Sequence, residues 1–323
     1  WSKIPEVFRY VNSLAPNLGT DFGYFAGGNN PATTTIDRID YSNDTATAAV
    51  KGPLYEGRRN HGATTNSSFG YFGGGNPSRS SVDRVDYSSD TDTASPKGPL
   101  TRTAPNLYKS STGNADFGYF AGGFPANSII DRVDYSNDSA TASLKGNLDR
   151  TVAGAAAAGT QSFGYFAGGG SPGGSAAQTS ISRIDYSSDT STSSPKGNLT
   201  ETRKNGVGST GNASYGYFGG GQGYPAPNRS SIDRIDYSND TATAPSKGPL
   251  EQTSTSLSAT GNSSFGYFGG VGSSRTKIDR VDYSNDTATA TPKGPLSSGR
   301  YSLSATSSRE NGTPTSSPIV TAT

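Results

Sequence analysis

The chain contains no cysteine and no methionine, and it has a single histidine in 323 residues. Without thiols it can form neither disulfide frameworks nor thiolate-bound zinc or iron–sulfur centres, and it cannot use thiol catalysis. One imidazole cannot build a multi-histidine metal centre. No stretch approaches the ~18 consecutive apolar residues of a membrane span. We therefore expect no metal, no cofactor and no insertion into a membrane.

Large hydrophobic residues other than tyrosine are also scarce, because Leu, Ile, Val and Phe together make up only 47 of the 323 residues. Such a low content normally indicates disorder, but disorder of that kind goes with a high net charge. This chain has 27 basic against 26 acidic side chains, so it carries no general signal for a polyanionic partner. Something other than a large aliphatic core must order it.

The dominant feature of the sequence is internal repetition. The motif Phe/Tyr-Gly-Tyr-Phe-(Ala/Gly)-Gly occurs six times at spacings of 46 to 52 residues. Each copy is followed, in constant order, by Asp-Tyr-Ser-(Asn/Ser)-Asp and by Lys-Gly-(Pro/Asn)-Leu. The central tyrosines of the aromatic motif are Tyr24, Tyr71, Tyr119, Tyr165, Tyr217 and Tyr267. The chain therefore contains six structural units.

Each unit divides into short strands separated by turn residues. In the first unit, residues 22–26 are aromatic and precede Gly-Gly, and residues 36–41 are rich in β-branched and aromatic side chains. Residues 42–45 have turn chemistry, and residues 45–48 alternate polar and small side chains as an exposed outer strand would. A weaker fourth strand precedes the next aromatic motif. Four strands per unit predict one blade of a β-propeller.

The Gly-Gly doublet after an aromatic strand, followed by a strand that ends near Tyr and Asp, resembles a kelch-type blade. Kelch blades usually carry a Trp near the end of the last strand, where this chain has residues such as Ala46 and Thr47. The sequence Phe-Gly-Tyr-Phe-Gly-Gly, then Val-Asp-Arg-Val-Asp-Tyr-Ser-Asn-Asp-Thr, is also similar to repeats in tail-fibre and structural proteins of marine bacteriophages, including cyanophages. The resemblance implies an all-β fold, a six-bladed kelch-like β-propeller of four-stranded antiparallel blades, on a virion surface or in another extracellular assembly.

The repeats divide the chain into three parts: an N-terminal strand or anchor segment at residues 1–20, the propeller at 21–306, and a tail rich in Ser, Thr and Pro at 307–323. A closed ring needs its two ends to share a blade. Residues 10–17 and 300–306 both have the pattern of an inner strand; we expect the C-terminal copy to close the ring, and the reverse arrangement stays open. Because the chain begins at Trp1, we expect a processed form or a fragment of a longer product.

Every unit has an arginine two residues before an aspartate, and residues i and i+2 of a strand share a face. An Arg–carboxylate bond, within the pair or between blades, would lock each blade to its neighbour. We prefer this interpretation to a ring of ligand-binding arginines, because a group needed in every blade is usually part of the blade. The residues are Arg38 and Asp40, Arg84 and Asp86, Arg132 and Asp134, Arg183 and Asp185, Arg234 and Asp236, and Arg280 and Asp282.

The turn after each pair has alternating oxygen ligands at Asp40, Ser42 and Asp44, as a calcium loop would. An EF-hand loop needs Gly and Glu where this sequence has Thr45 and Lys51, so turn capping is the preferred interpretation and no metal is predicted. The turns also contain Asn-x-Ser/Thr sequons, which could carry sugar in a chain secreted by a glycosylating cell. The candidate asparagines are Asn43, Asn66, Asn212, Asn239, Asn262 and Asn285.

In a four-stranded meander, the loops between the second and third strands lie on the same face as the connections between blades. Placed in this way, basic side chains outnumber acidic ones on that face, and the opposite face receives aspartates with no Lys or Arg. The basic face also has the longest and least repetitive loops, which is typical of a binding surface. The candidate ligand contacts are Arg58, Arg59, Arg79, Tyr224, Arg229 and Arg275.

We therefore expect a non-enzymatic structural and binding module that contacts a surface glycan, or neighbouring virion subunits, through its basic face. One alternative is a subunit of a head-to-tail extracellular filament, a homo-oligomer in which basic and acidic faces attract. Another is a glycan-processing propeller enzyme, although we name no catalytic residue, because no non-repeated acid–base set stands out. Nucleic acid is not an expected partner, because no stacking platform or groove-binding helix is present.

Overall fold

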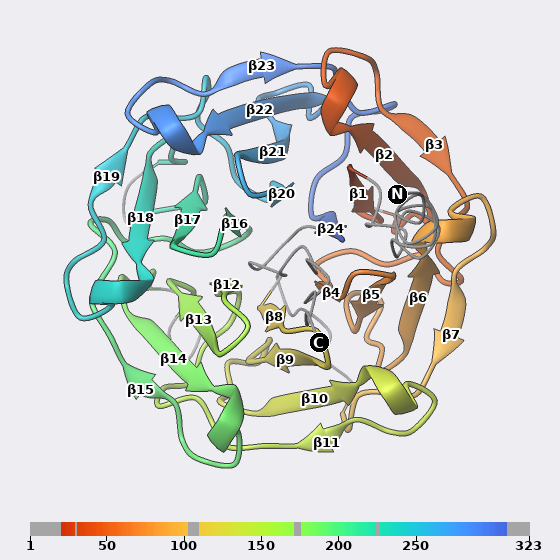
Figure 1. Ribbon diagram of the computed structural model, residues 1–323, viewed down its shortest axis with the longest axis vertical. Coiled ribbons are helices and arrows are strands. Elements are labelled where there is room, and N and C mark those ends of the chain that lie inside the picture. Colours follow the sequence, from red (N-terminus) through yellow and green to blue (C-terminus); the bar gives the residue numbers. More distant parts are fainter. Residues whose placement is uncertain (1–20, 30, 103–109, 171–175, 224–226, 309–323) are drawn as a thin grey trace, which may run out of the picture.

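The computed structural model describes residues 21–29, 31–102, 110–170, 176–223 and 227–308. In these ranges the chain forms six four-stranded antiparallel sheets, arranged as blades around a central axis (Figure 1). This arrangement confirms the predicted six-bladed, all-β propeller. In the part of the chain so described, the helices are single 3-10 turns, and none is long and apolar enough to cross a membrane.

In blades 2 to 6 the strands follow one another outward from the axis in sequence order, and in blade 1 the last strand of the chain is innermost (Figure 1). The inner strands are β4 (Gly62–Thr65), β8 (Ser111–Gly113), β12 (Ala156–Gly159), β16 (Gly208–Gly211), β20 (Ser258–Gly261) and β24 (Ser304–Ser307). The aromatic second strands are β1 (Phe22–Ala26), β5 (Phe69–Gly73), β9 (Phe117–Ala121), β13 (Phe163–Ala167), β17 (Tyr215–Gly219) and β21 (Phe265–Val271).

The third strands carry the repeated Arg and Asp. They are β2 (Ile36–Asp40), β6 (Val82–Asp86), β10 (Ile130–Asp134), β14 (Ile181–Asp185), β18 (Ile232–Asp236) and β22 (Lys277–Asp282). The outer strands are β3 (Ala49–Lys51), β7 (Ser95–Lys97), β11 (Ser143–Leu144), β15 (Ser194–Pro195), β19 (Ser246–Lys247) and β23 (Thr291–Lys293).

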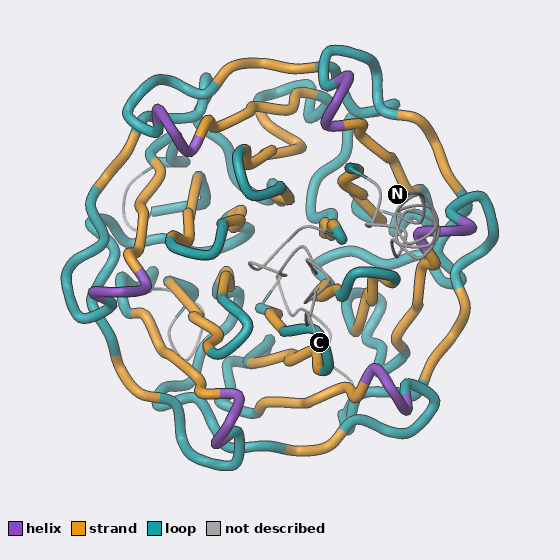
Figure 2. Tube along the Cα trace, in the orientation of Figure 1, coloured by secondary structure: helices purple, strands orange, loops and turns teal. Residues whose placement is uncertain are grey.

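A 3-10 turn links the third strand of each blade to its outer strand (Figure 2). The turns are η1 (Tyr41–Asn43), η2 (Tyr87–Ser89), η3 (Tyr135–Asn137), η4 (Tyr186–Ser188), η5 (Tyr237–Asn239) and η6 (Tyr283–Asn285). The outer strand predicted at residues 45–48 is therefore misplaced, because the chain is still turning there and runs alongside β2 only from Ala49. We call the side of the disc that carries these turns the turn face, and the opposite side the loop face.

The C-terminal segment closes the ring. Strand β24 pairs antiparallel with β1, with Gly23 opposite Ser307 and Ala26 opposite Ser304, and so supplies the inner strand of blade 1. This confirms the expected closure by the C-terminal copy. The strand includes Ser307, one residue beyond the expected boundary, whereas residues 1–20 and 309–323 lie outside the described residues.

Aromatic side chains supply the core that aliphatic residues do not. The Tyr and Phe at the centre of each second strand are almost completely buried; Tyr119 and Phe120 are both 0% exposed. The packing joins neighbouring blades, because Phe166 of blade 4 contacts a cluster that contains Tyr119 and Ile130 of blade 3. The tyrosine of each aromatic strand also stacks on the tyrosine that begins the 3-10 turn of the next blade around the ring, with ring centroids 4.6 to 5.0 Å apart.

The glycine of each Lys-Gly motif permits close contact between blades. A Cβ on Gly98 would lie 1.8 Å from the carbonyl oxygen of Ala140 in the next blade. The Gly98 N–H donates a hydrogen bond of 2.8 Å to the main-chain oxygen of Asp138, in the same turn. The motif is therefore a steric requirement of the interface between blades.

The repeated arginines do join neighbouring blades, as the preferred interpretation has it, but their partner is not the predicted aspartate. Arg84 binds Asp138 of the next blade at 2.7 Å, Lys97 binds the other oxygen of that carboxylate at 3.2 Å, and the Tyr71 hydroxyl donates to it at 3.0 Å. We call this group the inter-blade clamp. It occurs at all six interfaces, on Asp90, Asp138, Asp189, Asp240, Asp286 and Asp44.

The aspartate two residues after each arginine has a different role. Asp40 caps the 3-10 turn η1, because its carboxylate accepts hydrogen bonds from the backbone N–H and the hydroxyl of Ser42. The same bonds occur at Asp86, Asp134, Asp185, Asp236 and Asp282. A local turn satisfies this carboxylate, so the arginine pairs instead with the aspartate at the far end of the next blade's turn. The turn-capping interpretation is thus confirmed.

Candidate functional site

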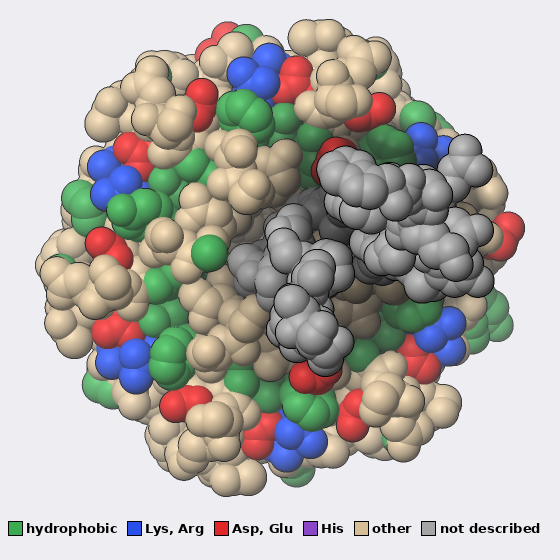
Figure 3. Space-filling view, in the orientation of Figure 1, with side chains coloured by type: hydrophobic (Ala, Val, Ile, Leu, Met, Phe, Trp, Pro, Cys, Tyr) green, Lys and Arg blue, Asp and Glu red, His purple; other side chains and the backbone are tan. Residues whose placement is uncertain are grey.

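The predicted sorting of charge between the two faces is wrong for the six clamp aspartates, which were expected to face no Lys or Arg. Each clamp aspartate is at most 10% exposed and is neutralised by an Arg and a Lys of the preceding blade. On the turn face, Lys and Arg side chains consequently lie beside acidic side chains around the rim (Figure 3). The cations come from the third and outer strands of each blade. The prediction considered only the loop residues, which on this face are acidic.

On the loop face, Arg58 lies inside the scaffold and not on its surface. Its side chain is 0% exposed and donates to the Gly74 and Ser81 carbonyls at 3.1 and 2.9 Å and to Asp83 at 2.7 Å. Burial lowers the pKa of Arg58 and raises that of Asp83, while each ion opposes the shift of the other. Glu56 approaches the same guanidinium at 3.8 Å. Arg58 cannot contact a ligand, because no part of it reaches the surface.

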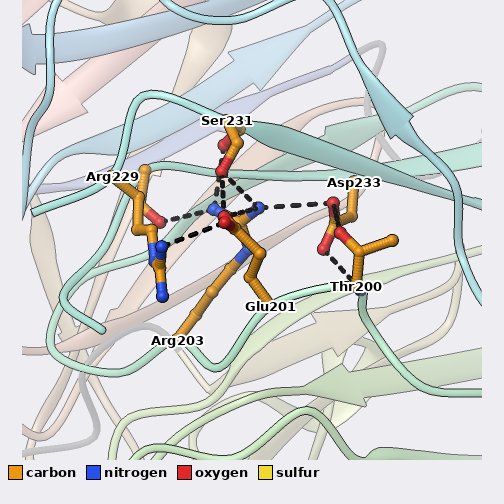
Figure 4. Close-up of polar contacts among 7 residues, drawn as sticks. Thr200, Glu201, Arg203, Arg229, Ser231 and Asp233 are labelled. Atoms are coloured by element: carbon orange, nitrogen blue, oxygen red, sulfur yellow. Dashed lines mark hydrogen bonds and ion pairs between the residues drawn. The ribbon is translucent and has the colours of Figure 1, made fainter. Parts of the chain in front are cut away.

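The same constellation occurs between blades 4 and 5 (Figure 4). Buried Arg203 reaches Asp233 at 3.3 Å, and Glu201 forms an ion pair with Arg229 at 2.9 Å. The equivalent surface pair between blades 1 and 2 is Glu56 with Arg79, at 2.8 Å. Arg79 and Arg229, both predicted as ligand contacts, therefore already hold a carboxylate.

The remaining predicted ligand contacts are Arg59, Tyr224 and Arg275. Arg59 donates from Nε to the Asn76 side chain at 3.3 Å, and Tyr224 lies outside the described residues. Arg275 lines a pocket. The structure therefore does not bring the predicted arginines together in one site.

The pocket lies between blades 5 and 6 on the loop face and has a volume of about 470 Å³. Hydroxyl and amide side chains dominate it. Its lining consists of Asn228, Gln252, Thr253, Ser254, Gly272, Ser273 and Arg275. We call it the loop-face pocket. Such a surface offers hydrogen-bond donors and acceptors in several directions, together with one cation.

Arg275 occupies this pocket in a conformation that is unusual for its residue type. Its φ is +59°, in the left-handed region that favours Gly and Asn. The guanidinium donates to the Thr255 carbonyl, and burial lowers the pKa of Arg275. Among the described residues, no carboxylate forms an ion pair with it. A strained backbone that presents a cation in a pocket is a reason to infer function there.

In the described residues, the interface below the pocket does not have the buried Arg–Asp pair that Arg58, Arg203 and Arg300 form at three other interfaces. These arginines stand seven residues after the Lys of a Lys-Gly motif, whereas the other three units have Ala104, Val152 and Ser254 at that position. Asp279, the counterpart of Asp83, accepts the Glu251 N–H at 2.9 Å, while its Oδ1 atom has no hydrogen-bond partner. Burial, with repulsion from Glu251, raises the pKa of Asp279 to about 6. Blade 6 also has buried Val271 where other blades have glycine.

Two further hollows lie on the turn face, between blades 2 and 3 and between blades 5 and 6. Equivalent repeat residues line both, such as the capping Asp134 in one and Asp282 in the other. Because these residues already form the turns, the hollows are a weaker indication of function than the non-repeated loop-face pocket. No group of three or more His, Asp or Glu in the described ranges could hold a metal ion.

Comparison with known proteins supports the fold and goes no further. No protein-family model and no curated protein matches the chain. A solved structure described as "Structure of YjhT" is similar, with a TM-score of 0.64 and 11% sequence identity, covering 78% of this chain and 88% of that one. At this identity the similarity concerns the arrangement of the strands alone.

Proposed function

We propose that this chain is a non-enzymatic propeller whose loop-face pocket binds an anionic glycan. The observation that carries the proposal is Arg275, which has no carboxylate partner among the described residues and lies among neutral hydroxyl and amide side chains. Hydroxyls and amides match the hydroxyl groups of a sugar, and a guanidinium binds a carboxylate or sulfate through charge-assisted hydrogen bonds.

A binding role is favoured over catalysis by what lines the pocket. General acid–base chemistry on a glycosidic bond needs positioned carboxyl groups, or a nucleophile with a base beside it. The described lining has no Asp, Glu or His. The single histidine, His61, is 0% exposed and packs near Phe72. A glycan-processing enzyme is therefore the weaker proposal.

The rest of the disc suits a rigid presenting scaffold. Clamps at all six interfaces hold the blades, so the pocket sits on a rigid support. The repeats resemble those of phage tail-fibre and structural proteins, which favours a virion surface or another extracellular assembly as the setting. The head-to-tail filament loses part of its argument, because the clamp aspartates of the turn face are paired with Arg and Lys.

A screen of immobilised glycans that includes uronic-acid and sulfated sugars tests this proposal, followed by affinity measurements on the best ligand. We expect Arg275→Ala to weaken binding about 10- to 100-fold, the range for losing a charge-assisted hydrogen bond. Arg59→Ala is the matched control, because it removes another loop-face arginine that does not line the pocket. Equal binding by both variants, or release of reducing ends from the bound glycan, would contradict the proposal.

A further inference from the structure

The outer strands of the blades form the rim of the disc and present unpaired edges (Figure 1). An edge strand with free N–H and C=O groups can pair with another chain, and natural sheets commonly block such edges with proline or charge. One position in each outer strand lies opposite the residue that precedes the repeated Arg of the third strand. Its occupants are Val50, Pro96, Leu144, Pro195, Ser246 and Pro292.

The backbone N–H at this position points away from the blade. In blade 3, the next residue, Lys145, donates its N–H inward to the Ile130 carbonyl at 3.0 Å, and alternate residues of a strand point their N–H groups in opposite directions. Proline is accommodated here in blades 2, 4 and 6 because it removes only an outward donor. Those three edges are thereby closed to strand addition.

Blades 1 and 3 differ, because they keep the outward N–H and add an exposed apolar side chain. Val50 is 61% exposed and Leu144 is 62% exposed, and these are two of the four large hydrophobic side chains that are exposed in the described residues. Blade 5 has the polar Ser246 at this position, next to Pro245. The open, apolar edges are thus confined to β3 and β11.

Both open edges are also electrically neutral. Residues 45–50 and 139–144 contain only Thr, Ala, Ser, Val and Leu. The following lysines, Lys51 and Lys145, hold clamp aspartates at 3.2 and 3.3 Å and are at most 15% exposed, so they do not guard the edge. A partner that matches such an edge is itself short, neutral and β-prone, and the corresponding edge of another copy has this chemistry.

We propose that copies of this chain associate edge to edge through β3 and β11. Antiparallel pairing would satisfy the outward N–H and C=O groups of both strands and cover Val50 and Leu144. The two edges lie on different blades, with blade 2 between them, so each copy can engage two neighbours and the contact can repeat through an assembly. Strands of two or three residues bury little area, which makes each contact weak and dependent on many copies.

The test is sedimentation velocity and small-angle scattering from about 10 µM to about 1 mM, since contacts of this size give weak affinity. We expect concentration-dependent association of the wild type, and at least a 10-fold lower association constant for the double variant Val50→Pro, Leu144→Pro. Proline occurs naturally at this position in three blades. The double variant should therefore keep the wild-type circular dichroism spectrum and the wild-type glycan binding. Ser246→Pro is the control, because it closes blade 5 and leaves both open edges intact.

Pro292→Val provides the reverse change, since it opens the edge of blade 6 and should strengthen association. A wild type that stays monomeric throughout would overturn the proposal, even if a foreign extended peptide bound the same edges. So would a double proline variant that associates as the wild type does. Glycan binding is read separately, so failure here is distinguishable from failure of the loop-face pocket.

Discussion

The Tyr267 hydroxyl donates a hydrogen bond of 3.0 Å to the Asp44 carboxylate, joining the last repeat to the first. Arg280 and Lys293 bind the same carboxylate at 2.7 and 3.1 Å. Burial alone would raise the pKa of Asp44, but the bonds from Lys293, Tyr267 and Arg280 outweigh it and lower the pKa. Asp44 is therefore an anion that these three partners stabilise.

Asp44→Ala should destabilise the disc by about 2–4 kcal/mol, because it leaves two cations without their partner. Asp138→Ala removes the equivalent bonds at an internal interface and should cost a similar amount. Only Asp44→Ala should loosen the pairing of β1 with β24, which closes the ring. These two strands stand at opposite ends of the propeller sequence, so their pairing depends on the contact between blades 6 and 1. Hydrogen exchange of residues 22–26 in both variants checks this, and equal exchange would contradict it.

Phe120→Ala should cost about 3–5 kcal/mol, because this ring is 0% exposed and its loss leaves a cavity between blades 2 and 3. Phe124→Ala is the matched control, since Phe124 is 46% exposed and should change stability by less than about 0.5 kcal/mol. Thermal and denaturant unfolding of the two variants measure the difference. An unchanged melting curve for Phe120→Ala would mean that the aromatic strands are not the core.

Gly98→Ala should prevent the close contact between blades 2 and 3 and cost about 3 kcal/mol or more, the upper end for overpacking. The added Cβ would lie 1.8 Å from a backbone oxygen, which cannot move aside as a flexible side chain could. Gly57→Ala is the milder comparison, because its nearest atom is 2.9 Å away. Denaturant midpoints compare the two, and equal shifts would argue against a steric role for the Lys-Gly motif.

Most of the fold could be predicted from the sequence because its signals are local and occur six times. An aromatic strand before Gly-Gly and an Asp-Tyr-Ser turn each specify their own geometry. The partner of Arg84 could not be predicted in this way. The two candidates, Asp86 and Asp138, differ in how the next blade is placed, and strand periodicity carries no information on that placement.

The site was harder to predict because exposure is a tertiary property. Arg58 looked like a loop cation but lies under its own loop, against Asp83. A usable signal was present, since Arg203 and Arg300 repeat its position relative to the Lys-Gly motif and a repeated residue is usually part of the scaffold. The left-handed conformation of Arg275 has no counterpart in the sequence pattern.

The stability of the disc should depend on pH through Asp279. Its folded-state pKa is raised to about 6, above the ordinary value of 3.8, because the carboxyl is buried and Glu251 lies nearby. Between these two values the folded chain holds a proton that the unfolded chain has lost, so stability falls as pH rises from 3.8 to about 6 and stays lower above it. A shift of this size corresponds to about 2–3 kcal/mol.

Asp279→Asn should remove this dependence, because the amide keeps the acceptor for the Glu251 N–H and cannot ionise. We expect the variant to be more stable than the wild type at pH 7.5 and close to it at pH 4.5, as measured by denaturant unfolding. Asp83→Asn is the control with the opposite sign, since it leaves Arg58 buried without its anion and should destabilise at both pH values. The prediction is wrong if acidification to pH 4.5 does not stabilise the wild type relative to Asp279→Asn. That result would mean that the Asp279 carboxylate is already paired with a cation.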